Sequence, residues 1–143
     1  MVLRPAPLVL LLVLLSGQSL AQALKNQDAG IRETVLNYVN GRNTGDSVQL
    51  KKAFHKDAAL SFIDVDGELV KWTAAEYINR MSTGKKQDCT GEILEVRSFM
   101  DAAQATVVLK YSHTIYYDYL NLLRLHGRWV ITDKIFSKKA TAQ

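Results

Sequence analysis

The stretch of sequence that decides the fold is residues 116–136, which read YYDYLNLLRLHGRWVITDKIF. Aromatic, aliphatic and polar residues interleave through it, a pattern typical of strands that lie half-buried on a sheet. His126-Gly127 interrupts the pattern near its middle, and Gly127 can supply the positive φ that a tight hairpin needs. We therefore predict two long strands, 114–125 and 128–136, joined by a two-residue turn.

Four more strands are predicted upstream of this hairpin. Each is a run rich in β-branched, aromatic or aliphatic residues that is bounded by turn residues. Asp66-Gly67 is a strong two-residue turn signal between the first two. The predicted ranges are 58–65, 68–72, 90–99 and 103–112.

Three helices are predicted in the first half of the chain. In residues 28–42 the apolar residues recur at helical spacing, and Asp28 can cap the start. Asp46 or Ser47 can cap a second, short helix that ends near His55. Thr73 begins a third helix, because Thr73 and Glu76 have the spacing of a capping box. The apolar stripe of the first helix consists of Ile31, Val35, Leu36 and Val39.

The N-terminus has the pattern of a secretory signal peptide. Arg4 precedes an apolar run at residues 8–15, and small residues lead to Ala21 and Ala23, after either of which cleavage is plausible. The run is shorter than the roughly 20 apolar residues that cross a bilayer, so we expect no permanent membrane anchor. These features predict a periplasmic or secreted protein.

Residues 24–143 are then long enough for a single domain with one core. The whole chain has 18 Lys and Arg against 14 Asp and Glu. This small excess is spread along the chain and does not predict a nucleic-acid partner. Cys89 is the only cysteine, so no internal disulfide can form; we expect a small buried side chain there, the alternative being a reactive or intermolecular thiol.

Helices at the front and an antiparallel sheet behind them describe an α+β domain with the order ααββαββββ, in which a curved sheet forms a cone around the helices. This order, with residues 31–46, 54–58, 118–123 and 127–136, resembles the nuclear transport factor 2-like superfamily. Within it, the chain is most similar to the exported putative lumazine-binding family. The resemblance covers nearly all of residues 24–143.

The resemblance implies a pocket between the helices and the concave face of the sheet, and often a homodimer through the outer face. It does not imply one chemistry, because the superfamily includes isomerases, dehydratases, polyketide cyclases and noncatalytic binding or association domains. The chain has no hydrolase, zinc or phosphate-loop motif. We expect neither a metal nor a cofactor.

Tyr38 is the first candidate site residue. The segment around it resembles the one in which ketosteroid isomerases place an oxyanion-stabilising tyrosine. The position of the base of those enzymes, an aspartate, falls near Phe62, which cannot transfer a proton. Tyr38 is therefore either a pocket hydroxyl or an interior tyrosine whose hydroxyl is satisfied by a neighbour.

Asp118 is the second candidate. Successive strand residues alternate between faces, so Asp118 shares a face with Tyr116 while Tyr117 and Tyr119 lie on the other. If that face is concave, Asp118 is a carboxylate in an apolar pocket that can act as acid, base or hydrogen-bond partner. If it faces outward, it pairs with a cross-strand cation, Lys134 or Lys110.

Together these residues predict an exported domain that binds a small molecule, for example an aromatic one, or associates with itself, without catalysis. The predicted ligand-binding residues are Tyr38, Phe62, Trp72, Tyr116 and Asp118. The alternative is an isomerase, dehydratase or polyketide-cyclase-like enzyme in which Asp118 and His55 transfer protons and Tyr38 stabilises an oxyanion.

Overall fold

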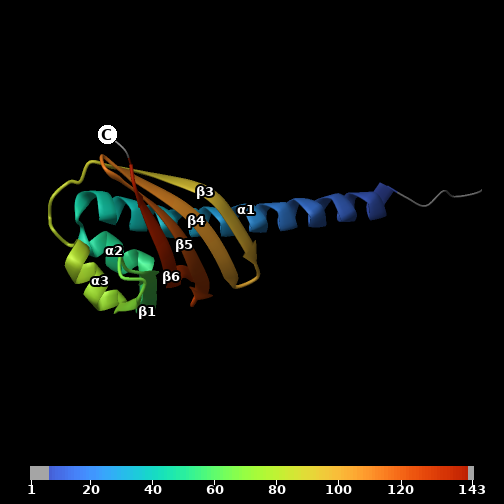
Figure 1. Ribbon diagram of the computed structural model, residues 1–143. Helices are drawn as coiled ribbons and strands as arrows, with labels where there is room; N and C mark the ends of the chain where they lie inside the picture. Colours follow the sequence, from blue (N-terminus) through green and yellow to red (C-terminus); the bar gives the residue numbers. More distant parts are fainter. Residues whose placement is uncertain (1–6, 142–143) are drawn as a thin grey trace, which may run out of the picture.

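The protein is a six-stranded curved sheet with three helices on its concave side (Figure 1). The computed structural model describes residues 7–141 and, within the first helix, the side chains of residues 22, 25 and 27 onward. The elements follow the predicted order. They are α1 (Pro7–Thr44), α2 (Ser47–Ala53), β1 (Phe54–Ile63), β2 (Leu69–Thr73), α3 (Ala74–Met81), β3 (Cys89–Phe99), β4 (Ala102–Tyr111), β5 (Thr114–Leu125) and β6 (Arg128–Ala140).

The first helix has no break at Asp28, so the prediction that Asp28 caps its start is wrong. The Asp28 carboxylate instead accepts a hydrogen bond from Arg32, one turn further on. Residues 1–6 of the predicted signal peptide lie outside the described residues, and so do most of its side chains. In the described part of the chain, no helix is long and apolar enough to span a membrane.

The sheet has the strand order β2-β1-β6-β5-β4-β3. Neighbouring strands are antiparallel except β1 and β6, which are parallel. β1 starts at Phe54, not at the predicted residue 58, because Phe54 pairs with Ile131 of β6 across a register shift. His55 therefore lies in a strand and does not end a helix.

Two hairpin turns were predicted at specific residues. The β5–β6 turn is confirmed, since Leu125 pairs with Arg128, and both His126 and Gly127 have positive φ. The β1–β2 connection is longer than predicted. It spans residues 64–68, where the Asp64 carboxylate accepts hydrogen bonds from the backbone N–H groups of Asp66 and Glu68.

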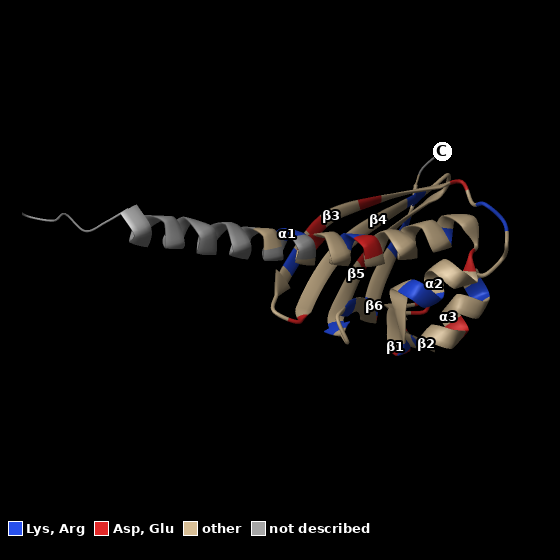
Figure 2. Ribbon diagram, turned by 180° about the vertical axis from the view of Figure 1, so that it is seen from behind, with Lys and Arg blue, Asp and Glu red and all other residues tan. Residues whose placement is uncertain are grey.

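The caps of α2 and α3 agree with the sequence pattern. Asp46 accepts hydrogen bonds from the first N–H groups of α2, and Thr73 and Glu76 form a capping box at α3. These caps fix where the two short helices begin. Lysines lie on α2 and on the loop between α3 and β3, where they are exposed (Figure 2).

The core lies between α1 and the concave face of the sheet. The apolar stripe of α1 packs against alternate residues of β4, β5 and β6, which Ala105, Leu120 and Ile131 exemplify. α1 approaches β3 so closely at Gly91 that a Cβ there would be 2.2 Å from Val39. Cys89 is buried in this core, as predicted, while Leu36 of the predicted stripe is exposed.

Candidate functional site

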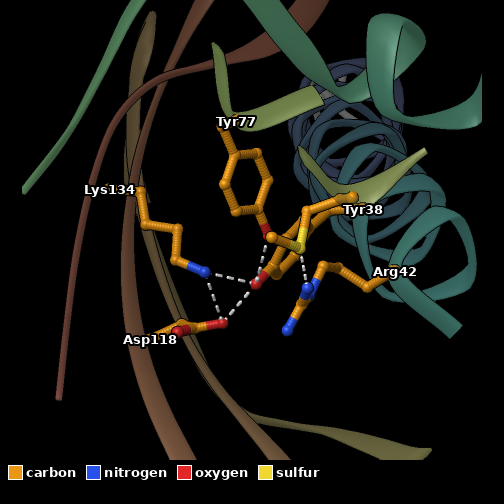
Figure 3. Close-up of polar contacts among 6 residues, drawn as sticks. Tyr38, Arg42, Tyr77, Asp118 and Lys134 are labelled. Carbon is orange, nitrogen blue, oxygen red and sulfur yellow. Dashed lines mark hydrogen bonds and ion pairs between the residues drawn. The ribbon is translucent and has the colours of Figure 1, made fainter. Parts of the chain in front are cut away.

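Three polar side chains meet at the centre of the core (Figure 3). Tyr38 comes from α1, Asp118 from β5 and Lys134 from β6, and each is at most 3% exposed. The Tyr38 hydroxyl donates a hydrogen bond to Asp118 Oδ2 and accepts one from Lys134 Nζ. Lys134 Nζ also lies 3.0 Å from Asp118 Oδ2. We call these three residues the buried triad.

Strand pairing explains why the two charges of the buried triad meet. Lys134 pairs with Leu120, two residues along β5 from Asp118, so the lysine and the aspartate are diagonal neighbours on one face. That face is the concave one. Asp118 therefore points inward and still pairs with Lys134, a combination of the two alternatives that the sequence left open.

The pKa of Tyr38 is raised well above its ordinary value. Burial is the largest cause, and the negative charge of Asp118 adds to it, because both disfavour a phenolate. The hydroxyl therefore keeps its proton and donates a hydrogen bond to the carboxylate. Asp118 Oδ1 has no hydrogen-bond partner among the described residues.

A hollow of about 310 Å³ lies beside the buried triad, and aromatic rings form most of its wall. The Phe62 and Phe136 rings are stacked with centroids 4.7 Å apart, and Trp72 packs edge-on against Phe62 at 4.9 Å. The volume of the hollow is in the range of small-molecule sites. This aromatic hollow is lined by Arg42, Phe62, Trp72, Tyr77, Met81, Tyr116, Lys134, Phe136 and Lys138.

A second hollow, also of about 310 Å³, shares the wall residues Arg42, Met81 and Tyr116 with the aromatic hollow. We call it the outer hollow. It opens where the loop after α3 meets the turn between β4 and β5. Its remaining wall residues are Arg80, Thr83, Gln87, Tyr111, Ser112, His113 and Thr114.

Arg42 lies in the wall that separates the two hollows. Its guanidinium carbon is 5.6 to 5.9 Å from the ring centroids of Tyr77, Tyr111 and Tyr116. It donates a hydrogen bond to the Met81 sulfur, a weak acceptor. Burial lowers the pKa of Arg42, but the surrounding tyrosines and Asp118 outweigh this effect and raise it above its ordinary value. The group stays charged.

Comparison with known proteins assigns the family. Residues 26–137 match the family described as "Putative lumazine-binding". The chain belongs to this family. A nuclear transport factor 2-like protein of unknown function from Shewanella baltica has a similar structure, with a TM-score of 0.76 and 22% identity over 81% of this chain and 96% of that one. The fold is thus nuclear transport factor 2-like.

Two other similarities concern named enzyme groups. A ketosteroid isomerase-like protein from Erwinia carotovora atroseptica has a TM-score of 0.64 and 17% identity, covering 79% of this chain and 96% of that chain. The aldolase FrzH of Cladobotryum sp is 24% identical over 102 residues, which are 69% of this chain and 81% of the aldolase.

In this member of the family, the structure separates the candidate ligand-binding residues into two groups. Phe62, Trp72 and Tyr116 line the aromatic hollow. Tyr38 and Asp118 are completely buried beneath Lys134 and are not among its wall residues. Lys134 is therefore the member of the buried triad that reaches the hollow.

His55 lies apart from the other candidates. It lines a separate surface hollow with Phe54, Ile78 and Arg128, and its Nδ1 accepts a hydrogen bond from the Asp57 backbone. His55 is not among the wall residues of the aromatic hollow, and its pairing with Asp118 in proton transfer stays a prediction. Within the described residues, no cluster of three His, Cys, Asp or Glu side chains could hold a metal ion.

Arg42 and Phe136 were not among the predicted site residues, and Lys134 was considered only as a surface partner of Asp118. The sequence does carry a signal for Arg42, because it follows Tyr38 by four residues and so lies on the same face of α1. For Lys134, the signal is its strand parity with Phe136, which also lines the hollow.

Proposed function

We propose that the protein is an exported, noncatalytic domain that binds a small aromatic molecule in the aromatic hollow. The observation that carries this proposal is the wall itself: Phe62, Trp72, Tyr116 and Phe136 present ring faces and edges around one space of ligand size. Aromatic rings bind planar ligands by stacking and by removal of apolar surface from water. The family description, lumazine binding, agrees with a planar heterocyclic ligand.

The buried triad supports the noncatalytic part of the proposal. A general acid or base has to reach the substrate proton directly or through one water. Asp118 is completely buried, and its Oδ2 contacts both Tyr38 and Lys134. The Tyr38 hydroxyl already donates its hydrogen bond to that oxygen. The triad thus has the partners of a structural network.

Calorimetry and thermal shift with a panel of flavins, pteridines, steroids and polyketides test the binding proposal. A ligand of the aromatic hollow should stabilise the wild-type protein and should quench Trp72 fluorescence. Replacement of Phe62 by alanine should weaken its binding by about 1–3 kcal/mol, since a stacked ring is lost. Phe99→Ala is the matched control, because Phe99 is exposed at the end of β3. Equal effects of the two substitutions, or no binding at all, would contradict the proposal.

A second candidate function is an enzyme of the isomerase, dehydratase or polyketide-cyclase kind, and the aldolase similarity favours a carbonyl substrate for it. Lys134 is the observation behind this candidate, because a lysine amine beside a hollow can form an imine with a carbonyl compound. Its Nζ already contacts Asp118 Oδ2 and the Tyr38 hydroxyl, so it is engaged in the core and not free to attack a carbonyl. We therefore rank binding above catalysis.

Reductive trapping distinguishes the two candidates. Incubation with acetaldehyde or pyruvate and borohydride, followed by mass spectrometry, should leave Lys134 unmodified if the domain only binds. A modified Lys134 peptide, absent from Lys134→Arg, would establish the enzyme candidate. Turnover of any substrate that survives Asp118→Asn would remove Asp118 from the mechanism.

We further propose that the mature protein is a homodimer that forms through the outer face of the sheet. Tyr117, Tyr119 and Ile135 support this, because they are 42–51% exposed and Tyr119 pairs directly with Ile135. Sedimentation should give a dimer for the wild type and a monomer for Tyr119→Asp. A wild-type monomer at micromolar concentration excludes this interface. Export is tested by cell fractionation, with cleavage expected after Ala21 or Ala23.

A further inference from the structure

The side chains around the aromatic and outer hollows carry one sign of charge. Arg42, Arg80, Lys134 and Lys138 line these hollows, and no Asp or Glu is among the wall residues of either. Asp118 lies beneath Lys134 and forms its ion pair with that residue. The other three cations form no ion pair with any carboxylate of the described residues.

Arg42 is the most confined of these three cations. Its Nε is buried and has no hydrogen-bond partner among the described residues, and the acceptor of its terminal nitrogen is a thioether sulfur. A buried donor that lacks an acceptor costs about 1–3 kcal/mol, more for a charged group. Figure 3 shows the Arg42 side chain on the opposite side of Tyr38 from Lys134. Arg42 thus retains unused donors in a shared wall of the two hollows.

We propose that the molecule bound in the aromatic hollow is an aromatic anion: a planar ring with a carboxylate or phosphate group whose oxygen atoms accept hydrogen bonds from Arg42. This inference rests on the proposed binding function. The ring would stack against Phe62, Trp72 or Phe136, while the anionic group would reach Arg42 at the boundary with the outer hollow. A guanidinium binds such oxygen atoms through parallel, charge-assisted hydrogen bonds.

The neighbouring side chains fit the same ligand. Arg80 stacks over the Trp72 ring at 4.9 Å and brings a second guanidinium to the outer end of the site. Lys138, which is exposed on β6, adds a third charge at the mouth of the aromatic hollow. A neutral aromatic ligand would stack on the rings of the wall but would leave these cations without an anionic partner.

Matched probes test the inference. Calorimetry should compare 2-naphthoate with 2-naphthamide, and 2-naphthyl phosphate with 2-naphthol, so that each pair shares its ring and differs in charge. The anion of at least one pair should bind about tenfold to a hundredfold more tightly than its neutral partner, the range of a charge-assisted hydrogen bond. The two pairs also distinguish a carboxylate ligand from a phosphate ligand.

Substitutions assign the preference to Arg42. Arg42→Gln should remove most of the difference within a pair while leaving the neutral member unchanged, and Arg42→Lys should retain part of it. Arg97→Gln is the control, because Arg97 is an exposed arginine on β3 whose carboxylate partner is Glu95. If Arg42→Gln does not fold, Lys138→Gln serves instead. Loss of the Lys138 charge should lower anion binding a few-fold, and the fold should be unaffected because this side chain is exposed.

The outcomes separate the two proposals. Equal binding of the charged and neutral probes overturns the anion inference and leaves the binding function in place. If no probe binds at about 1 mM, which corresponds to a binding free energy near −4 kcal/mol, both the anion inference and the binding function are overturned. An anion preference that survives both Arg42→Gln and Lys138→Gln also overturns the anion inference, because other residues would then bind the anionic group.

Discussion

Lys134 and Arg42 approach the same hollow from opposite sides, Lys134 from β6 and Arg42 from α1 (Figure 3). Lys134 has a carboxylate at 3.0 Å and a tyrosine hydroxyl as partners. Arg42 has three tyrosine rings and a sulfur atom. The comparison suggests that the protein uses the first cation to hold its own core and keeps the second available for a ligand. Four predictions test this division.

The largest effect should come from Asp118→Asn. It leaves the Lys134 ammonium buried without its counter-charge, and breaking a buried pair on one side costs about 3–5 kcal/mol. Urea unfolding followed by circular dichroism measures the loss. The double replacement Asp118→Leu with Lys134→Met should recover most of it, since no charge is then left unpaired. If Asp118→Asn alone is as stable as the wild type, the Asp118–Lys134 pair does not stabilise the fold.

Tyr38→Phe should have the next largest effect. It removes the hydroxyl that links the two charges, and a buried hydrogen bond to a charged group contributes about 1.5–3 kcal/mol. The same unfolding experiment applies. Tyr117→Phe is the control, because Tyr117 is exposed on the outer face and the change keeps the ring that the proposed dimer would bury. Similar losses in both variants would mean that Tyr38 has no special role.

Alkaline pH should weaken the fold by a smaller amount. The folded-state pKa of Tyr38 is raised above the ordinary 10.0, so its contribution is fully present below pH 10 and is lost as the pH rises toward the folded value. Above pH 10 the unfolded chain releases this proton and the folded protein does not. The free energy of unfolding should therefore fall by about 1.4 kcal/mol per pH unit from this group. Tyr38→Phe should show a slope that is shallower by this amount; identical slopes would contradict the assignment.

Arg42→Met should have the smallest effect on stability. It loses cation–π contacts of about 1–2 kcal/mol but also removes a buried donor without a partner, so we expect a net cost near 1 kcal/mol. Urea unfolding of Arg42→Met beside Asp118→Asn provides the check. If the two substitutions lower the free energy of unfolding equally, the proposed division is contradicted, because Arg42 would then stabilise the core as much as the Asp118–Lys134 pair does.

Local chemistry explains which parts of the fold could be predicted. Turn residues at His126-Gly127, the capping box at Thr73 and the alternation along residues 114–125 act between neighbours in sequence. Each was found where expected. The loop at 64–68 is longer than predicted, because the Asp64 carboxylate accepts hydrogen bonds from backbone N–H groups across it, although Gly67 has the expected positive φ.

The candidate site was only partly predictable. Phe62, Trp72 and Tyr116 could be proposed because they are large aromatic residues on expected strands, and all three line one hollow. His55 was misplaced because the start of β1 depends on pairing with a strand more than 70 residues later. No local pattern contains that pairing.

By itself the sequence determined the element order, the β5–β6 hairpin, the caps of α2 and α3 and the shared face of Tyr116 and Asp118, because spacing and turn chemistry act over a few residues. The tertiary structure decided the rest. The β5–β6 register brings Lys134 to Asp118, but only the packing of α1 on the sheet brings Tyr38 to this pair and leaves Arg42 without an ion-pair partner in the described part of the chain, since no pattern along the chain places the helix on the sheet.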